Sequence, residues 1–254
     1  MGTDIVRAAV DGRGIAELVV DRPPVNALPA ADWYRLAREL DRLGGDPGVR
    51  VVVLRAEGRG FNAGVDIRQL RADSDDSALI GVNRGCFAAF AAVYDCAVPV
   101  VAAVHGFCLG GGVGLVGNAD VVVAAEDAYF GLPEVDRGAL GAATHLSRLV
   151  PAHRARAMMY TCATATAAEL HAFGSVLDVV PNERLRERAL EVAAEIAAKD
   201  PLVIRAAKEA FNGIDLWDVK RSYRYEQGFT FELGLSGAAR RVRDTFGRGP
   251  DGEA

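Results

Sequence analysis

One carboxylate stands in a segment whose neighbours are apolar or fix the course of the backbone. Glu134 lies in the run Phe130–Gly138, between Pro133 and Gly138, which favour a loop. Burial among apolar neighbours raises the pKa of a carboxylate, because it penalises the charged form, and the group then suits a general base. A surface glutamate paired with Arg137 is the alternative that the pattern leaves open.

Two glycine-rich segments predict backbone N–H groups that point the same way without partners. Gly110-Gly111-Gly112 follows an apolar run and opens a short predicted helix, and Gly58–Gly64 follows another apolar run. Unpaired N–H groups at such turns attract negative charge, and two of them in a dry pocket make an oxyanion hole. The alternative is that these glycines only allow tight turns and close packing.

A further glycine pattern, Gly112–Gly117, matches the G-x-G-x-x-G fingerprint of dinucleotide-binding folds. Three residues separate its last glycine from the predicted strand Val121–Ala125. A crossover between parallel strands needs a helix of about ten residues or more, so we predict no nicotinamide or flavin site. His105 and Cys108 have no second ligand pair at a suitable spacing, so no metal site is predicted.

The composition is that of a globular protein. The chain has 254 residues, is 50% hydrophobic and 25% charged, and carries a net charge of −5. This balance gives no electrostatic reason to bind nucleic acid. Four cysteines without paired spacing favour a reducing compartment, so we expect a cytoplasmic protein. The uncharged stretch Ala97–Gly117 contains Pro99 and six glycines, which predicts a buried strand and turn rather than a membrane span.

The elements that must hold these groups alternate between strand and helix. Two β-rich runs, Ile5–Val10 and Ile15–Val20, flank a glycine-containing turn and predict a hairpin. Apolar residues from Trp33 to Leu43 recur at helical spacing. From Thr144 onward the pattern is mainly helical. Continuous apolar runs predict buried strands at 49–55, 98–104 and 121–125, and the fold class is α/β.

Four stretches, in this order and spacing, resemble the crotonase (enoyl-CoA hydratase/isomerase) superfamily: PPVNAL at 23–28, GRGFNAGVDI at 58–67, VPVVAAVHGFCLGGGVGL at 98–115 and YFGLPEVDRGALG at 129–141. The resemblance implies a spiral of ββα units over 1–190 and a C-terminal helical trimerisation region over 191–254. It implies a homotrimer or homohexamer, for which the aromatic run Tyr223, Tyr225, Phe229 and Phe231 supplies apolar surface. The implied substrate is an acyl-CoA thioester, with no cofactor beyond that coenzyme A and no membrane partner.

Carried over position by position, the resemblance assigns a role to each motif. It implies that the backbone N–H groups of Val65 and Gly111 form the oxyanion hole and that Glu134 is the base. Asp136 and His145 are candidates to assist it. The residues implied to hold coenzyme A lie near the same motifs: Val25, Ala27, Ala63, Gly64, Asp66, Ile67, Gly110 and Pro133.

The chain departs from the family at one informative position. Hydratases of the superfamily carry a second glutamate in the helix after the glycines, where this chain has Gly114. Hydration orients one water between two carboxylates, so the missing glutamate disfavours ordinary hydration. Enoyl-CoA isomerisation, and other reactions of a single base on a thioester enolate, remain open. The absent side chain also predicts room for a bulky fused-ring acyl group.

Longer stretches resemble one subgroup of the superfamily: NRGCFAAFAAVYDCAVPV at 83–100, FGLPEVDRGALGAATHLSRLVP at 130–151 and EQGFTFEL at 226–233. This subgroup comprises actinobacterial hydrolases of steroid (cholesterol) breakdown that open ring D of a bicyclic indane-dione carboxyl-CoA. The resemblance implies hydrolysis of a carbon–carbon bond beside a ring ketone. An enoyl-CoA hydratase or isomerase for fatty acyl-CoA is one alternative, and a catalytically silent CoA-binding subunit is another.

Overall fold

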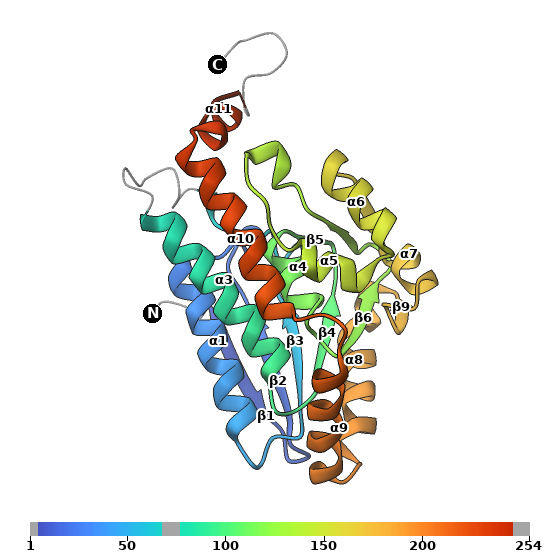
Figure 1. Ribbon diagram of the computed structural model, residues 1–254. Coiled ribbons are helices and arrows are strands. Elements are labelled where there is room, and N and C mark those ends of the chain that lie inside the picture. Colours follow the sequence, from blue (N-terminus) through green and yellow to red (C-terminus); the bar gives the residue numbers. More distant parts are fainter. Residues whose placement is uncertain (1–4, 68–76, 246–254) are drawn as a thin grey trace.

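The computed structural model describes residues 5–67 and 77–245, which fold around a six-stranded sheet (Figure 1). The strand order is β1-β2-β3-β4-β6-β9. β1 and β2 form the predicted antiparallel hairpin, and the remaining neighbours are parallel. The strand bounds are Val6–Val10 (β1), Ile15–Val20 (β2), Val51–Ala56 (β3), Val100–Val104 (β4), Val121–Ala125 (β6) and Asp178–Val180 (β9).

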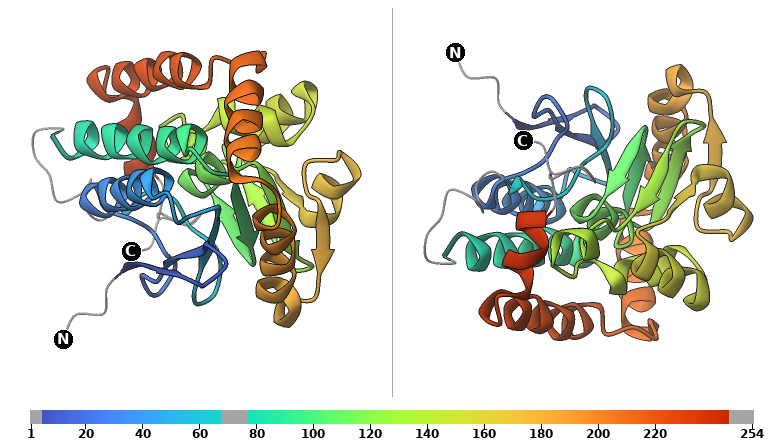
Figure 2. Two further views of the ribbon diagram at one scale, coloured as in Figure 1. Left: turned by 90° about the horizontal axis from the view of Figure 1, so that it is seen from below. Right: turned by 90° about the horizontal axis from the view of Figure 1, so that it is seen from above.

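Alternation along the buried strands divides the core between the two faces of this sheet. On β3, Val51 and Val53 point to the face covered by α8 (Asn182–Ala197), whereas Val52 and Leu54 point to the opposite face. On that opposite face α1 (Ala30–Gly45) buries the predicted stripe from Trp33 to Leu43 and packs against α3 (Ser77–Asp95) (Figure 2). Both faces are therefore covered, which explains the continuous apolar runs of the strands.

A second sheet, which the sequence does not predict, consists of β5 (Phe107–Leu109), β7 (Tyr129–Gly131) and β8 (Thr164–Thr166). Three-residue strands are too short to show a hydrophobic period. β5 and β7 are parallel, with Leu109 opposite Gly131, and the Gly110 N–H donates to the Gly131 carbonyl at 3.0 Å. Parallel pairing brings the residues that follow both strands to the same edge, so the second glycine segment and the loop of Glu134 become neighbours.

The C-terminal half is helical, as predicted. α8 crosses the expected 190/191 boundary as one continuous helix, and its buried face packs on the sheet, so the whole of α8 belongs with the core. Residues 246–254 of the expected C-terminal region lie outside the described residues. The remaining helices are α4 (Gly111–Val116), η1 (Val135–Arg137), α5 (Ala143–Leu149), α6 (Ala152–Thr161), α7 (Ala167–Ala172), α9 (Pro201–Ile214), α10 (Val219–Leu235) and α11 (Ala238–Thr245).

The uncharged stretch Ala97–Gly117 folds as β4, β5 and α4. The buried strand and the short helix were predicted, and the three-residue strand β5 lies in the segment between them. One described helix, α3, is long and apolar enough to cross a membrane by length and composition. Half of its apolar window is buried inside the protein, where α3 packs between α1 and α10. Core helices pass the same test, so this is weak evidence for a span.

Candidate active site

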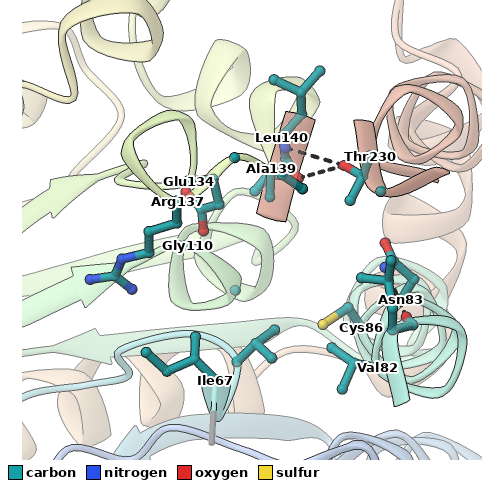
Figure 3. A pocket seen from close by; sticks show the side chains of 18 of the residues that line it. Ile67, Val82, Asn83, Cys86, Gly110, Glu134, Arg137, Ala139, Leu140 and Thr230 are labelled. Carbon is teal, nitrogen blue, oxygen red and sulfur yellow. Dashed lines mark hydrogen bonds between the residues drawn. The ribbon is translucent and has the colours of Figure 1, made fainter. Parts of the chain in front are cut away.

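A mostly apolar cavity of about 130 Å³ lies where α3, α10 and the two glycine segments meet (Figure 3). Glu134, Arg137 and Gly110 lie on one side of the cavity, facing Val82, Asn83 and Cys86 of α3. Among the described residues that line it, Glu134 is the one carboxylate. The apolar lining includes Val65, Ile67, Leu79, Val82, Phe90, Leu140 and Ala142.

The Glu134 carboxyl is wedged between two backbone segments. A Cβ atom at Gly110 would lie 2.1 Å from Glu134 Oε1, and one at Gly141 would lie 3.2 Å from Glu134 Cγ. The residue as a whole is half-buried, but Oε2 is shielded from solvent and has no hydrogen-bond partner within the described chain. The absence of side chains at Gly110 and Gly141 thus leaves the space that the Glu134 carboxyl occupies.

Burial raises the pKa of Glu134 to about 8, because the carboxylate loses its hydration. The charge of Arg137 opposes this rise, and the charge of Glu226 adds to it. The surface ion pair with Arg137 that the sequence left open is not what the structure shows. A cavity-lining carboxyl with a pKa of about 8 and one oxygen without a hydrogen-bond partner in the described chain has the properties of a general base.

Val65 and Gly111, whose backbone N–H groups are the predicted oxyanion hole, line the same cavity as Glu134. The backbone of Leu28 forms hydrogen bonds with both sequence neighbours of Val65. The Leu28 N–H donates to the Gly64 carbonyl at 2.9 Å, and the Asp66 N–H donates to the Leu28 carbonyl at 3.0 Å. In this parallel bridge the Val65 N–H points away from Leu28. Within the described chain, neither the Val65 N–H nor the Gly111 N–H donates a hydrogen bond.

Close packing brings these two glycine segments together, which confirms the tight-turn interpretation of the glycines and leaves the oxyanion hole as a prediction. A Cβ atom at Gly64 would lie 3.2 Å from the Gly111 nitrogen, and one at Gly111 would lie 2.7 Å from the Trp33 ring. Gly64 has a φ of +83°, which favours glycine, and its N–H donates to Asn62 Oδ1 at 2.8 Å. The arrangement places two unpaired donors at the cavity wall, as an oxyanion hole requires.

The space beside Gly114 is not open, which corrects the expectation of room for a bulky acyl group at that point. A Cβ atom at Gly114 would lie 2.2 Å from Cζ of Phe90. The Phe90 ring lines the cavity and packs edge-on against Trp33 and His145, with ring centroids 5.7 and 4.9 Å away. Phe90 thus occupies the place that a side chain at position 114 would need.

The other residues expected to hold coenzyme A divide into two sets. Ala63, Ile67 and Gly110 line the cavity. Asp66 instead pairs with Arg22 at 3.1 Å, and the same guanidinium donates to the Ala27 carbonyl at 3.0 Å.

Two further members of that set also lie outside the cavity lining. The Val25 carbonyl accepts the Ala63 N–H at 3.1 Å. Val25 and Pro133, like Ala27, Gly64 and Asp66, are absent from the described residues that line the cavity, although Pro133 immediately precedes Glu134.

Asp136 and His145, the candidates to assist the base, do not line the cavity either. Asp136 is exposed on η1 and contacts the Cys162 thiol. His145 is buried against Phe90 and Tyr223, and burial lowers its pKa to about 3, which keeps the ring neutral. The structure therefore places His145 behind the wall of the cavity, as an aromatic packing residue.

Several residues at the cavity were not predicted from the sequence. Tyr223 was expected at a subunit interface, but it faces inward and lines the cavity, whereas Tyr225 and Phe229 on the same helix are exposed. Cys86 lies opposite Glu134 in a helix whose sequence indicates only a core element. These residues come together because α3 packs against α10, and the spacing of residues along the sequence does not predict such a long-range contact. No group of three or more metal ligands is found among residues 5–67 and 77–245.

Comparison with known proteins identifies the family of this chain. Residues 11–230 match the enoyl-CoA hydratase/isomerase family. A (7aS)-7a-methyl-1,5-dioxo-2,3,5,6,7,7a-hexahydro-1H-indene-carboxyl-CoA hydrolase from Rhodococcus jostii is 61% identical over 241 residues, which cover 95% of this chain and 93% of that protein. The protein of the same name from Mycobacterium tuberculosis is 62% identical over 233 residues, covering 92% and 94% of the two chains.

Solved structures share the fold. An enoyl-CoA hydratase/isomerase from Xanthobacter autotrophicus superposes with a TM-score of 0.85 at 26% identity, covering 96% of this chain and 92% of that one. The match extends through the spiral core into the C-terminal helices, which confirms the predicted α/β architecture with its helical C-terminal region.

Proposed function

The chain belongs to the enoyl-CoA hydratase/isomerase family, and on that premise we propose that it is a CoA-thioester hydrolase that cleaves a carbon–carbon bond beside a ring ketone. The two relatives above 60% identity, both named as hydrolases of a dioxo-hexahydroindene-carboxyl-CoA, support this substrate. The reaction opens the five-membered ring that carries the ketone. It consumes only water and the thioester, so it needs no separate cofactor.

One observation carries the proposal: Glu134 is the one carboxylate among the described residues that line the cavity, its Oε2 has no hydrogen-bond partner in the described chain, and Phe90 occupies the place beside Gly114. A single base suffices to activate one water for attack on a ketone, whereas hydration of a double bond uses two carboxylates. A silent CoA-binding subunit would gain nothing from keeping a buried carboxylate unpaired, because such a group destabilises the fold.

The proposed reaction proceeds in two steps. Glu134 removes a proton from water as its oxygen adds to the ring ketone, giving a tetrahedral oxyanion. The bond between this carbon and the ring-fusion carbon then breaks, leaving a carboxylic acid. The electron pair moves through the conjugated double bond to the thioester oxygen, where the Val65 and Gly111 N–H groups stabilise the enolate. Glu134 returns its proton to carbon. Loss of one such N–H donor typically costs about 3 kcal/mol of barrier.

The test is turnover of the dioxo-hexahydroindene-carboxyl-CoA beside crotonyl-CoA, with NMR of each product. Ring opening and hydration both add one water and have the same mass, so mass alone does not separate them. We expect a ring-opened acid from the first substrate and little hydration of the second. Efficient hydration of crotonyl-CoA with no ring opening would overturn the proposal.

An enoyl-CoA isomerase is the second candidate, since one carboxylate beside an oxyanion hole also moves a double bond. Incubation of a 3-enoyl-CoA with the protein separates the two activities. Accumulation of the conjugated 2-enoyl-CoA at a rate above that of ring opening would favour the isomerase.

We also propose that the protein assembles as a homotrimer or homohexamer in the cytoplasm and holds coenzyme A along the segment that contains Ala63 and Ile67. Apolar side chains left exposed on α9, α10 and their connection support the assembly: Leu202, Val203, Phe211, Ile214, Leu216, Tyr225 and Leu235. Light scattering of the purified protein tests it, and a stable species of 26.9 kDa would contradict it.

A further inference from the structure

Two side chains of helix α10 form hydrogen bonds with four backbone atoms of the segment Leu140–Thr144. Thr230 Oγ1 accepts the Leu140 N–H at 3.2 Å and donates to the Leu140 carbonyl at 3.0 Å (Figure 3). One turn earlier, Glu226 Oε1 accepts the Ala143 N–H at 2.8 Å and Oε2 accepts the Thr144 N–H at 3.3 Å. Both side chains are buried, so each bond is shielded from competing water.

The segment Leu140–Thr144 packs against the side chain of Glu134. Gly141, between the two attachment points, approaches so closely that a Cβ atom there would lie 3.2 Å from Glu134 Cγ and 3.4 Å from Cδ. Gly110 closes the other side of the carboxyl. Ala142 in this segment has a φ of +57°, which alanine adopts only with external support. Releasing the segment would therefore release the Glu134 side chain.

We propose that Glu226 and Thr230 are positioning residues for Glu134, holding the segment Leu140–Thr144 so that the carboxyl stays aimed into the cavity. This inference rests on the proposed function only in taking Glu134 as the base. Helix α10 then does more than line the cavity, because its hydrogen bonds to the segment Leu140–Thr144 fix the position of the Glu134 carboxyl.

Charge gives Glu226 a second influence on Glu134. Burial raises the pKa of Glu226 to about 7, although the Ala143 and Thr144 N–H groups oppose the rise. When ionised, Glu226 raises the pKa of Glu134. Within residues 5–67 and 77–245, the other titratable or charged groups that act on or respond to Glu134 are Arg137 of η1, Cys86 of α3, Tyr223 of α10 and Cys162 after α6.

The test compares Thr230→Val and Thr230→Ser for position, and Glu226→Gln for charge. Turnover of the ring-ketone thioester gives kcat and KM, and infrared titration of the protonated carboxyl band gives the pKa of Glu134, assigned by its loss in Glu134→Gln. Valine keeps the size of threonine and removes both bonds to Leu140, so we expect kcat to fall about tenfold, KM to change little and the Glu134 band to broaden. Serine keeps the hydroxyl and should restore wild-type behaviour.

Glu226→Gln keeps an acceptor for the Ala143 N–H and removes the charge. We expect the pKa of Glu134 to fall and the acid limb of kcat to move to lower pH. Glu232→Gln is the matched control, since Glu232 is an exposed glutamate on the same helix, and it should leave the pKa of Glu134 unchanged.

Two results would overturn the inference. One is a Thr230→Val protein with a lower melting temperature but an unchanged kcat and Glu134 band, which would assign Thr230 to fold stability alone. The other is a Glu134 titration that Glu226→Gln does not move. The infrared readout needs no turnover, so absence of ring opening by the wild-type protein would refute the proposed function and leave this inference to be decided separately.

Discussion

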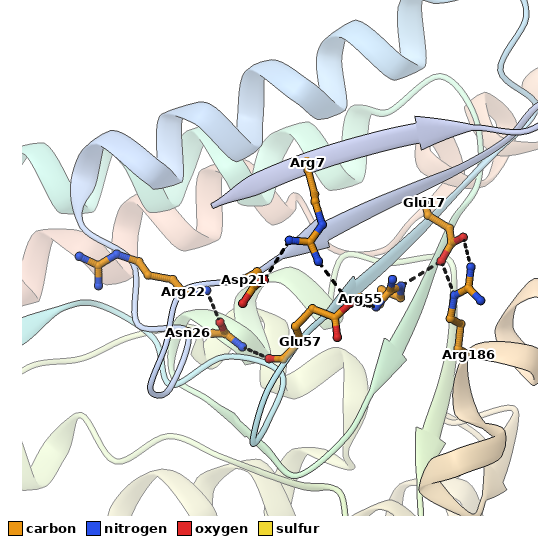
Figure 4. Close-up of polar contacts among 8 residues, drawn as sticks. All are labelled: Arg7, Glu17, Asp21, Arg22, Asn26, Arg55, Glu57 and Arg186. Atoms are coloured by element: carbon orange, nitrogen blue, oxygen red, sulfur yellow. Dashed lines mark hydrogen bonds and ion pairs between the residues drawn. The ribbon is translucent and has the colours of Figure 1, made fainter. Parts of the chain in front are cut away.

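Two regions of the molecule hold glutamates in contrasting surroundings: the rim of the β2–β3 surface beside α8, where Glu17 lies on strand β2, and the cavity between α3 and α10, which Glu134 lines. On the rim, Glu17 accepts hydrogen bonds from Arg55 at 2.9 Å and Arg186 at 2.6 Å (Figure 4). In the cavity, Glu134 Oε2 has no hydrogen-bond partner in the described chain. The hydrogen bonds from Arg186 and then Arg55 lower the pKa of Glu17, whereas burial raises that of Glu134 to about 8.

The difference shows how one side-chain type serves two purposes. Around Glu17, charges alternate in sign: Arg7 contacts Asp21 and Glu57, and Arg55 joins Glu57 to Glu17. The arginines beside Glu17 lower its pKa, so this carboxylate is held in its charged form. Around Glu134 the loss of hydration outweighs the opposing charge of Arg137, so this carboxyl keeps its proton until about pH 8. The carboxyl with fewer compensating partners, Glu134, is therefore the one suited to exchange a proton during a reaction.

The largest expected effect comes from Glu134→Gln. The amide keeps the size of the side chain and removes the basic oxygen, so turnover of the ring-ketone thioester should fall about 10²–10⁴-fold. Binding of the thioester, measured by calorimetry, should persist. Glu17→Gln makes the same chemical change on the rim and should leave turnover at the wild-type level. Near-wild-type ring opening by Glu134→Gln would remove Glu134 from the mechanism.

Adding a second carboxylate to the cavity region should be costly. Gly114→Glu overlaps Phe90, so we expect a loss of about 1–3 kcal/mol from overpacking, with the buried charge adding to it. Combining it with Phe90→Ala should relieve the overlap, and only this double variant should show hydration of crotonyl-CoA. Gly12→Glu is the control, because Gly12 lies in open space in the β1–β2 turn. Thermal unfolding and product NMR check both points; a Gly114→Glu protein as stable as the control would contradict the packing argument.

Glu134→Gln should also raise stability. The pKa of Glu134 is about 8 in the folded protein, against a reference value of 4.5, so the unfolded chain loses this proton first as pH rises. The carboxylate therefore lowers the free energy of unfolding progressively between those two values and most above pH 8. The variant should gain about 1–3 kcal/mol at high pH and little near pH 4. Denaturant melts at both pH values provide the measurement, and an equal gain at both would refute the ionic cause.

The pH dependence of turnover should report the same carboxylate. The basic form of Glu134 is the minor species below pH 8, so kcat/KM should rise about tenfold per pH unit on the acid side and level off near pH 8. A profile measured with a stable buffer series checks this. A plateau beginning near pH 4 would mean that Glu134 behaves as an ordinary, hydrated carboxylate.

The smallest effect is expected on the rim. Glu17→Gln should lower stability by about 0.2–1 kcal/mol, because solvent screens the ion pairs that it removes. Since the pKa of Glu17 is lowered in the folded protein, its contribution is present above the reference pKa of 4.5 and is lost as pH falls. Urea melts at neutral and acidic pH measure it. A loss at neutral pH as large as the gain in Glu134→Gln would erase the distinction between the two regions.

Local residue patterns by themselves determine much of this protein. Alternating and continuous apolar runs predict the β1–β2 hairpin and strands β3, β4 and β6, because the side chains must match the period of a covered sheet. The helical stripe from Trp33 to Leu43 predicts α1 for the same reason. Glu134 and the glycines at 110–112 stand out because their types and spacing serve few purposes other than chemistry or tight turns.

Tertiary structure alone decides what surrounds those groups. The parallel pairing of β5 with β7 sets Gly110 beside Glu134, and three-residue strands leave no periodic signal. Phe90, 24 residues before Gly114, fills the space that the glycine leaves, so an absent side chain did not mean an open pocket. Tyr223 turns inward while Tyr225 stays exposed, which depends on where α10 meets α3. Contacts between residues far apart in the chain are set by the packing of whole elements, and no local pattern contains them.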